Sequence, residues 1–244
     1  MHNDRSAGVV QRLMLASAFL LVAGQYSTGQ ILLTPPSRGA QSSISLLGGV
    51  SFPTGPSDFS DNWKTGYNLH AELEYPWDSS PENSLILLGT FHWASYPFDD
   101  AHFREYYLSL GKPPRIISSV RGPSATVWGF TGGSKLYTGG RRLYARVDLG
   151  YFSFQRGDVI VSGPDGTSTV NFTSKDGFLV NLGVGGYVTM SRTFDLVLEA
   201  DYDIASSSKD EPTGYLTSYS AAPFQIERKS TSVINLKSGV RIKL

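Results

Sequence analysis

The chain has 244 residues, its 21 Lys and Arg balance its 21 Asp and Glu, and it contains no cysteine. The balanced charge argues against a nucleic-acid partner, which favours a basic surface. The lack of cysteine excludes disulfides, thiolate metal sites and a cysteine nucleophile. Abundant Tyr and Phe are typical of β structure, and a chain of this length can form one β domain.

Residues 1–24 have the pattern of an export signal. A basic start that includes Arg5 precedes an apolar run at residues 13–23, which ends in small residues. This order is typical of a secretory signal peptide, and the run is shorter than the ~20 residues that a membrane-spanning helix needs. We expect residues 25–42 to form a linker and residues 43–244 to form the folded domain. An uncleaved N-terminal anchor is the alternative.

The rest of the chain alternates repeatedly between apolar and polar residues. In the last segment, Leu236 and Val240 share one face, while Lys237 and Arg241 lie on the other. A period of two predicts a strand with one apolar and one polar face. No helical period of comparable length appears. The predicted strands cover residues 43–52, 66–75, 84–94, 124–137, 142–154, 176–190, 194–204 and 230–244.

The connections between these segments alternate in length. Connections after odd-numbered strands are long, such as residues 95–122, and those after even-numbered strands are short, such as residues 191–193. This asymmetry is typical of outer-membrane barrels, which have short periplasmic turns and long extracellular loops. The sequence therefore predicts an eight-stranded antiparallel up-and-down transmembrane β-barrel, all-β in class, with both termini on the periplasmic side.

In such a barrel the polar faces point into the lumen. An eight-stranded barrel is only wide enough for packed side chains, so the charges inside must pair and we expect no wide pore. If Asp195 lies opposite Lys243, the same register places Asp201 opposite Lys237. We expect Glu72, Arg146, Glu199 and Arg241 to lie in the periplasmic half. The whole predicted lumen network is Glu72, Glu74, Arg146, Asp148, Glu199, Asp201, Lys237 and Arg241.

Aromatic residues on the apolar faces gather near the strand ends, with Leu, Val and Ala between them. Aromatic girdles on either side of an aliphatic band are expected where strands cross two membrane interfaces. The predicted girdle residues are Tyr67, Tyr75, Trp93, Tyr151, Phe178, Phe194 and Tyr202.

Taken together, these features resemble the OmpA/OmpX-type family of small outer-membrane β-barrels, over residues 43–244. The peptide LGGVSFPTGPSDF at residues 47–59 also resembles the first hairpin of such proteins. The resemblance implies a place in the bacterial outer membrane, contact with its lipid and lipopolysaccharide, and folding by the barrel-assembly machinery. It also implies a structural or surface-interaction role, such as adhesion or ligand binding at the loops. We expect a monomer with no cofactor, metal, nucleic-acid partner or enzymatic activity.

Two other functions stay open. The first is a soluble exported barrel, lipocalin-like, that binds a small apolar ligand. The second is an outer-membrane enzyme that modifies the acyl chains of lipid A, for which His92 and Ser95 are the candidates. A base must lie within hydrogen-bond reach of the hydroxyl that it activates. These residues are three apart and so face opposite sides of a strand, whereas the lipid A deacylase pattern places them two apart.

Some polar groups could also serve as metal ligands. His70, Glu72 and Glu74 share one strand face, although a structural lumen cluster is the simpler interpretation. Loop acids lack the alternating oxygen spacing of an EF-hand, which favours solvated turns. These loop acids are Asp58, Asp61, Asp99 and Asp100.

The long loops are rich in aromatic residues. Exposed aromatic loops could bind a partner, or these side chains could pack over the mouth of the barrel. The residues concerned are Phe98, Phe103, Tyr106, Tyr107 and Leu108 in one loop, and Tyr215 and Tyr219 in the last.

Overall fold

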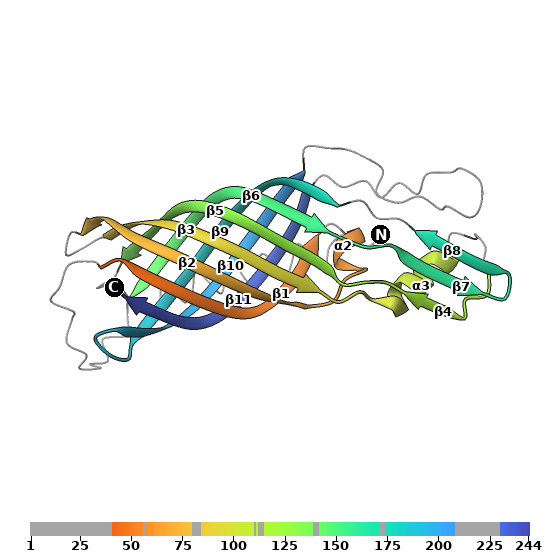
Figure 1. The fold of residues 1–244 in the computed structure, drawn as a ribbon, viewed down its shortest axis with the longest axis horizontal. Helices are drawn as coiled ribbons and strands as arrows, with labels where there is room; N and C mark the ends of the chain where they lie inside the picture. The colour runs from red at the N-terminus through yellow and green to blue at the C-terminus, as the bar shows by residue number, and fades with distance from the viewer. Residues whose placement is uncertain are drawn as a thin grey trace, which may run out of the picture.

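The computed structural model describes residues 41–55, 57–79, 84–109, 111, 115–138, 142–170, 174–207 and 230–244. Outside the described residues lie the predicted signal peptide and all of the predicted linker except residues 41 and 42. The loop residues Tyr215 and Tyr219 also lie outside them. The described part is elongated: a barrel carries a small sheet and a helix beyond one of its ends (Figure 1).

Eight strands close into an antiparallel barrel in the order β1-β11-β10-β9-β6-β5-β3-β2. Each barrel strand pairs with the barrel strand that follows it along the chain, and β1 pairs with β11. The predicted fold class is therefore confirmed. The barrel strands are β1 (Ser43–Gly55), β2 (Gly66–Ser79), β3 (Ser84–Tyr96), β5 (Ala125–Thr138), β6 (Leu143–Gln155), β9 (Lys175–Thr189), β10 (Phe194–Ser207) and β11 (Ser230–Lys243).

The barrel strands contain 13 to 15 residues each. A tilted strand needs ~9–11 residues to cross the hydrocarbon layer of a membrane. These strands therefore have enough length to cross a bilayer and to project beyond it.

The strand ends that the short connections join lie together at the end of the barrel where the chain terminates (Figure 1). We call this the turn end, and the opposite end the loop end. At the turn end the backbone N–H of Lys243 donates to the carbonyl of Thr193 at 2.9 Å, and that of Leu244 donates to Ser42 at 2.9 Å. The predicted separation of short and long connections is therefore present.

The first three long connections contain regular secondary structure. They form a four-residue helix, α2 (Ser57–Ser60), a ten-residue helix, α3 (Asp100–Ser109), and the sheet β4-β7-β8. We call α3 and this sheet the cap. None of the helices that the structure describes is long and apolar enough to span a bilayer. The three cap strands are β4 (Ser119–Arg121), β7 (Val159–Gly163) and β8 (Gly166–Val170).

Helix α3 lies in a segment where the sequence shows no clear helical period. Asp99 begins it by accepting a hydrogen bond from the backbone N–H of His102 at 3.2 Å, as an N-cap residue does. Only Phe103 and Tyr107, four residues apart, are buried. A single buried pair within a polar helix is too weak a periodic signal to read from sequence.

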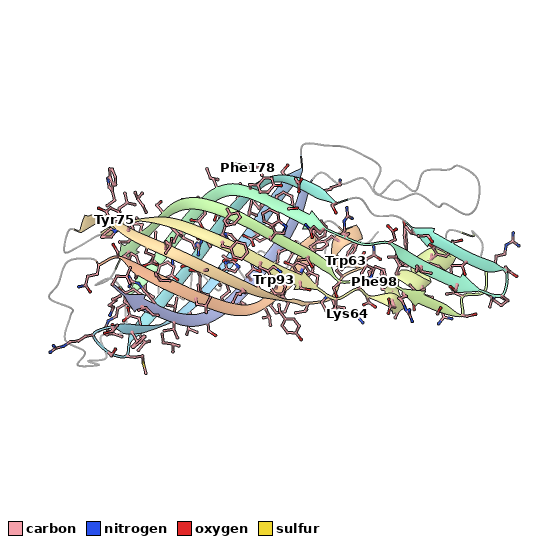
Figure 2. All side chains as sticks on the ribbon, in the orientation of Figure 1. Trp63, Lys64, Tyr75, Trp93, Phe98 and Phe178 are labelled. Atoms are coloured by element: carbon pink, nitrogen blue, oxygen red, sulfur yellow. The ribbon has the colours of Figure 1, made fainter. Side chains whose placement is uncertain are left out.

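One apolar cluster joins the cap to the loop half of the lumen. The rings of Phe59 and Phe154 are 5.3 Å apart, those of Trp63 and Phe98 are 5.6 Å apart, and those of Phe98 and Phe103 are 5.2 Å apart. Trp63 and Phe98 also form an isolated bridge at the junction that Figure 2 labels. We call this the aromatic cluster, and its main members are Phe59, Trp63, Tyr96, Phe98, Phe103, Tyr107, Phe152, Phe154, Val159, Val161, Val170 and Leu179.

The aromatic cluster decides between the two interpretations of the long aromatic loop. Phe98, Phe103 and Tyr107 pack over the mouth of the barrel. Tyr106 and Leu108 stay exposed, so only these two of the five residues are available to a partner.

Candidate functional site

The outer surface of the barrel is apolar. Leu198, Leu236 and Val240 are 57%, 45% and 45% exposed, and each points away from the lumen. A soluble carrier would bury these side chains and expose the charges, which is the reverse of what the strands do. Soluble monomers rarely expose apolar patches larger than a few hundred Å². This surface is therefore suited to hydrocarbon rather than to water.

Aromatic side chains border this surface towards both ends. Figure 2 places Tyr75 towards the turn end and Trp93 and Phe178 towards the loop end. Six of the seven predicted girdle residues are exposed, and Tyr202 is half-buried. Trp77 is a further exposed ring that sequence reasoning missed. It lies where the β2–β3 register shifts after Pro76, so strict alternation does not reveal its face.

The centre of the lumen is organised around Arg146 on β6. Its guanidinium pairs with Glu72 on β2 and with Asp148, and Nη1 lies 2.7 Å from Oε1 of Glu199 on β10. Nη2 also donates to Oγ1 of Thr90 on β3 at 3.0 Å. One side chain thus cross-links four walls of the barrel, and a planar guanidinium with several donors is suited to this task.

A glycine makes room for this guanidinium. Gly183 on β9 lies opposite Arg146 on one side and opposite Asp201 on the other. A Cβ at Gly183 would stand 2.9 Å from the Cγ of Arg146 and 2.9 Å from the Cβ of Asp201. The lumen has no space for that atom, so the sequence Gly183-Val184-Gly185 is explained by packing.

Lys135 on β5 is the central residue that sequence reasoning missed. Its Nζ lies 2.5 Å from Oε2 of Glu72 and 2.8 Å from Oε1 of Glu74, and it sits 4.6 Å from the centre of the Tyr144 ring. The signal was present, because Lys135 has the opposite parity to the outward-facing Leu136.

Two further groups extend the network. Near the turn end, Nε of Arg241 lies 2.9 Å from Oε2 of Glu74, and Nζ of Lys243 lies 2.6 Å from Oδ1 of Asp195. Towards the loop end, Lys237 pairs with Asp201, and its Nζ lies 2.6 Å from Glu199 and 3.0 Å from Nδ1 of His70. The structure places all eight predicted lumen residues inside the barrel, each of them buried: Glu72, Glu74, Arg146, Asp148, Glu199, Asp201, Lys237 and Arg241.

The predicted register of the last two strands is wrong by two residues. Asp195 lies opposite Arg241, and Asp201 lies opposite Asn235 rather than Lys237. A slip of two residues keeps every side chain on its own face, so the alternation cannot detect it. Lys243 reaches Asp195 and Lys237 reaches Asp201 as diagonal neighbours, which preserves the expected ion pairs.

The proposed catalytic pair is not assembled. His92 points into the lumen, where its Nε2 lies 2.7 Å from Oγ1 of Thr131 and its ring meets that of His70 edge to face, with the ring centroids 4.4 Å apart. Ser95 has the parity of the outward-facing Trp93. The two candidate residues therefore lie on opposite faces of β3.

The described residues contain no group of three or more His, Asp or Glu side chains that could hold a metal ion. Glu72 and Glu74 both pair with Lys135, which occupies their oxygens. Among the loop acids, Asp99 pairs with Lys64 at 3.5 Å (labelled in Figure 2) and Asp61 is exposed. Asp100 accepts from the backbone N–H of Gly122 at 3.3 Å, and the side chain of Asp58 lies outside the described residues.

The chain matches no family model and no curated protein sequence. Among solved structures it is similar to the attachment invasion locus protein Ail of Yersinia pestis, with 11% identity, a TM-score of 0.41, and 82% of this chain and 96% of that chain covered. It is also similar to Neisserial surface protein A, with 10% identity, a TM-score of 0.40 and coverages of 85% and 100%. A major outer membrane protein from Thermus thermophilus gives 13% identity, a TM-score of 0.46 and coverages of 84% and 100%.

The class of the protein follows from its own geometry. A closed eight-stranded antiparallel barrel satisfies all its strand edges, as a spanning structure in lipid must. An apolar exterior around a charged, filled lumen, with short turns at one end and long loops at the other, defines the class of small outer-membrane β-barrels.

Proposed function

We propose that the protein is an integral barrel of the bacterial outer membrane that presents a folded, rigid cap at the cell surface and conducts no ions. The observation that carries this proposal is the aromatic cluster. It includes residues of the cap and residues of the lumen, so the cap packs directly against the loop end of the barrel.

The filling of the bore supports a non-conducting barrel. The turn half of the lumen holds the ion network, whose side chains are paired across the bore. The loop half holds the aromatic cluster, in which Tyr96, Phe152 and Phe154 are almost fully buried. Ion conduction would require breaking buried ion pairs and displacing packed rings, and each of these costs several kcal/mol.

The cap supports a surface-interaction role. Flexible loops lose entropy when they bind a partner, whereas a pre-folded cap does not. The cap and the segment between α3 and β4 carry large exposed apolar side chains that the aromatic cluster does not cover: Tyr106, Leu108, Ile116 and Ile160. We propose that adhesion or ligand binding occurs on this surface.

Two experiments test the two parts of the proposal. In planar bilayers, the purified barrel should give no steady conductance above that of bilayers without protein, and a large steady conductance would contradict the closed bore. For the cap, cells that display a variant with Tyr106, Leu108, Ile116 and Ile160 changed to Ser should lose adhesion to a host-cell or matrix surface.

The matched control changes exposed polar residues of the cap, Arg121 and Thr167, to Ala. Equal adhesion by both variants, with both present at the surface in equal amounts, would contradict the surface role. The membrane location is tested separately, because an integral barrel resists alkaline extraction and migrates faster on a gel when it is not boiled.

A further inference from the structure

The lumen contains a small cavity where the ion network meets the aromatic cluster. Its volume is about 40 Å³, and most of its wall is apolar. The rings of Phe59, Tyr96, Phe152 and Phe154 contribute to that wall. The polar side chains that line it include His70, His92, Asp203 and Asn235.

Asp203 differs from the other carboxylates of the lumen. Two neutral amides hold it: Asn181 Nδ2 donates to Oδ1 at 2.6 Å, and Asn235 Nδ2 donates to Oδ2 at 2.7 Å. On the described strands, each of the remaining lumen carboxylates forms an ion pair, whereas Asp203 forms none. Lys237, on the adjacent strand, already pairs with Glu199 and Asp201. An ionised carboxylate that is removed from water is destabilising unless a cation lies beside it. A bound cation would therefore stabilise the ionised form of Asp203.

His92 provides a second unsatisfied group in the same wall. The side chain of His92 is buried, and its Nε2 lies 2.7 Å from Oγ1 of Thr131. Its Nδ1 has no hydrogen-bond partner. When the Nε2–H donates to Thr131, Nδ1 presents a lone pair. The neighbouring ring of His70 is held by Lys237 through Nδ1 at 3.0 Å. The cavity therefore combines an uncompensated carboxylate with an unused acceptor.

We propose that this cavity binds one small ammonium ion, of the size of ammonium or methylammonium. Its N–H groups would donate to Asp203 and to Nδ1 of His92, and the aromatic rings of the wall would attract the positive charge through their π faces. The volume of about 40 Å³ is the space open to the centre of a water-sized sphere, for which a single water needs only ~10–15 Å³, so the cavity has room for a small ammonium ion. A tetramethylated ammonium ion has no N–H group to donate to Asp203 or to Nδ1 of His92.

The site does not depend on the surface role or on the membrane location proposed above. It requires only the closed barrel. Phe59 of α2 forms part of the wall, so entry from the loop end requires α2 to move, and exchange is expected to be slow. An equilibrium measurement is therefore needed.

The test is equilibrium dialysis of the folded, detergent-solubilised chain against radiolabelled methylammonium chloride. A constant excess of tetramethylammonium chloride occupies exposed acidic groups and cannot make the N–H hydrogen bonds of the proposed site. The wild type should bind one methylammonium ion per chain, saturably, and unlabelled ammonium chloride should displace it. Asp203→Asn keeps the side-chain shape and removes the charge. It should weaken binding by about tenfold or more, the size expected for the loss of a charge-assisted hydrogen bond.

A second variant, Ala205→Leu, fills the cavity from a buried position in its wall and should abolish binding while Asp203 is retained. Asp158→Asn removes an exposed carboxylate of the loop end and should leave binding unchanged. Faster gel migration of each unboiled variant establishes that its barrel is folded. Absence of saturable binding by the folded wild type would overturn the proposal and show that water or a proton on Asp203 suffices. Undiminished binding by folded Asp203→Asn or Ala205→Leu would also overturn it.

Discussion

At the scale of single residues, the guanidinium of Arg146 reaches from β6 to carboxylates on β2 and β10 in the middle of the lumen. None of these groups meets bulk water, because each side chain is buried. A buried ion pair adds little over an apolar pair of the same volume, but removal of one partner leaves the other charge uncompensated. Removal of Arg146 should therefore be strongly destabilising, although the intact network adds little stability over apolar side chains of the same volume.

Replacement of Arg146 with Met, which keeps most of its volume, should lower the free energy of unfolding by ~3–5 kcal/mol, since Glu72, Asp148 and Glu199 then lose their shared partner. Urea unfolding in lipid vesicles, followed by tryptophan fluorescence, measures this change. The control is Arg121→Met, at an exposed position of the cap, where the loss should be close to zero. Similar losses of unfolding free energy in the two variants would contradict the role of Arg146 as the shared partner of the buried carboxylates.

Substitutions of lumen glycines should be costly in the same part of the barrel. In Gly183→Ala the new Cβ would stand 2.9 Å from atoms of both Arg146 and Asp201, so those side chains must move. Overpacking of this kind costs ~1–3 kcal/mol. Gly89→Ala, where no atom lies within 4 Å of the added Cβ, is the matched control in the same barrel. The same urea experiment should separate the two, and equal stability would refute the packing explanation.

At the scale of elements, α3 is held to the barrel by one face only. Phe103 and Tyr107 are fully buried in the aromatic cluster, while Tyr106 on the same helix is exposed. The barrel strands do not share this dependence, because a closed ladder of hydrogen bonds fixes them. The cap should therefore loosen before the barrel opens.

Phe103→Ala should release the cap, since truncation of a buried Phe costs ~3–5 kcal/mol. Limited proteolysis of the folded protein should cleave within residues 99–121 faster in this variant than in the wild type. Gel migration of the unboiled barrel should stay the same. Tyr106→Ala is the control and should leave the cleavage rate unchanged. Loss of the folded barrel band in Phe103→Ala would show that cap and barrel unfold as one unit.

The sequence predicted the barrel strands well because a barrel in lipid imposes a two-residue repeat on every strand. Leu198 faces outward and Glu199 inward for this reason alone. The same repeat could not fix the register of Asp195 against Arg241, because a two-residue slip leaves both faces intact. The cap escaped prediction because Phe103 and Tyr107 belong to a cluster that also contains Phe154 and Val161 from distant strands, and no local period records such a cluster.

The same limit applies to the ion network and the cavity in the lumen. The lumen acids and bases on clearly alternating strands could be found from sequence, whereas Lys135 is the one charged residue on a lumen face that otherwise carries Ala, Val, Gly, Thr and Tyr. The cavity beside Asp203 depends on which side chains meet across the bore. Sequence alternation gives the face of a residue but not its neighbour on the opposite wall.

At the scale of the whole molecule, the distribution of side chains is inverted relative to a soluble barrel. Apolar residues surround the outside, ionised residues fill the turn half of the bore, and aromatic residues fill the loop half and continue into the cap. This arrangement is stable only where the outside meets hydrocarbon. The membrane location and the placement of the cap at the cell surface depend on this inversion.

The inversion can be measured directly with spin labels, because the chain has no cysteine of its own and each label reports one chosen position. Labels on single cysteines at Leu196, Leu198 and Leu236, in protein reconstituted into lipid vesicles, should relax strongly with oxygen, which partitions into hydrocarbon. They should be protected from a water-soluble nickel complex. Exposure of these three positions to the nickel complex, with protection from oxygen, would contradict the membrane-facing barrel.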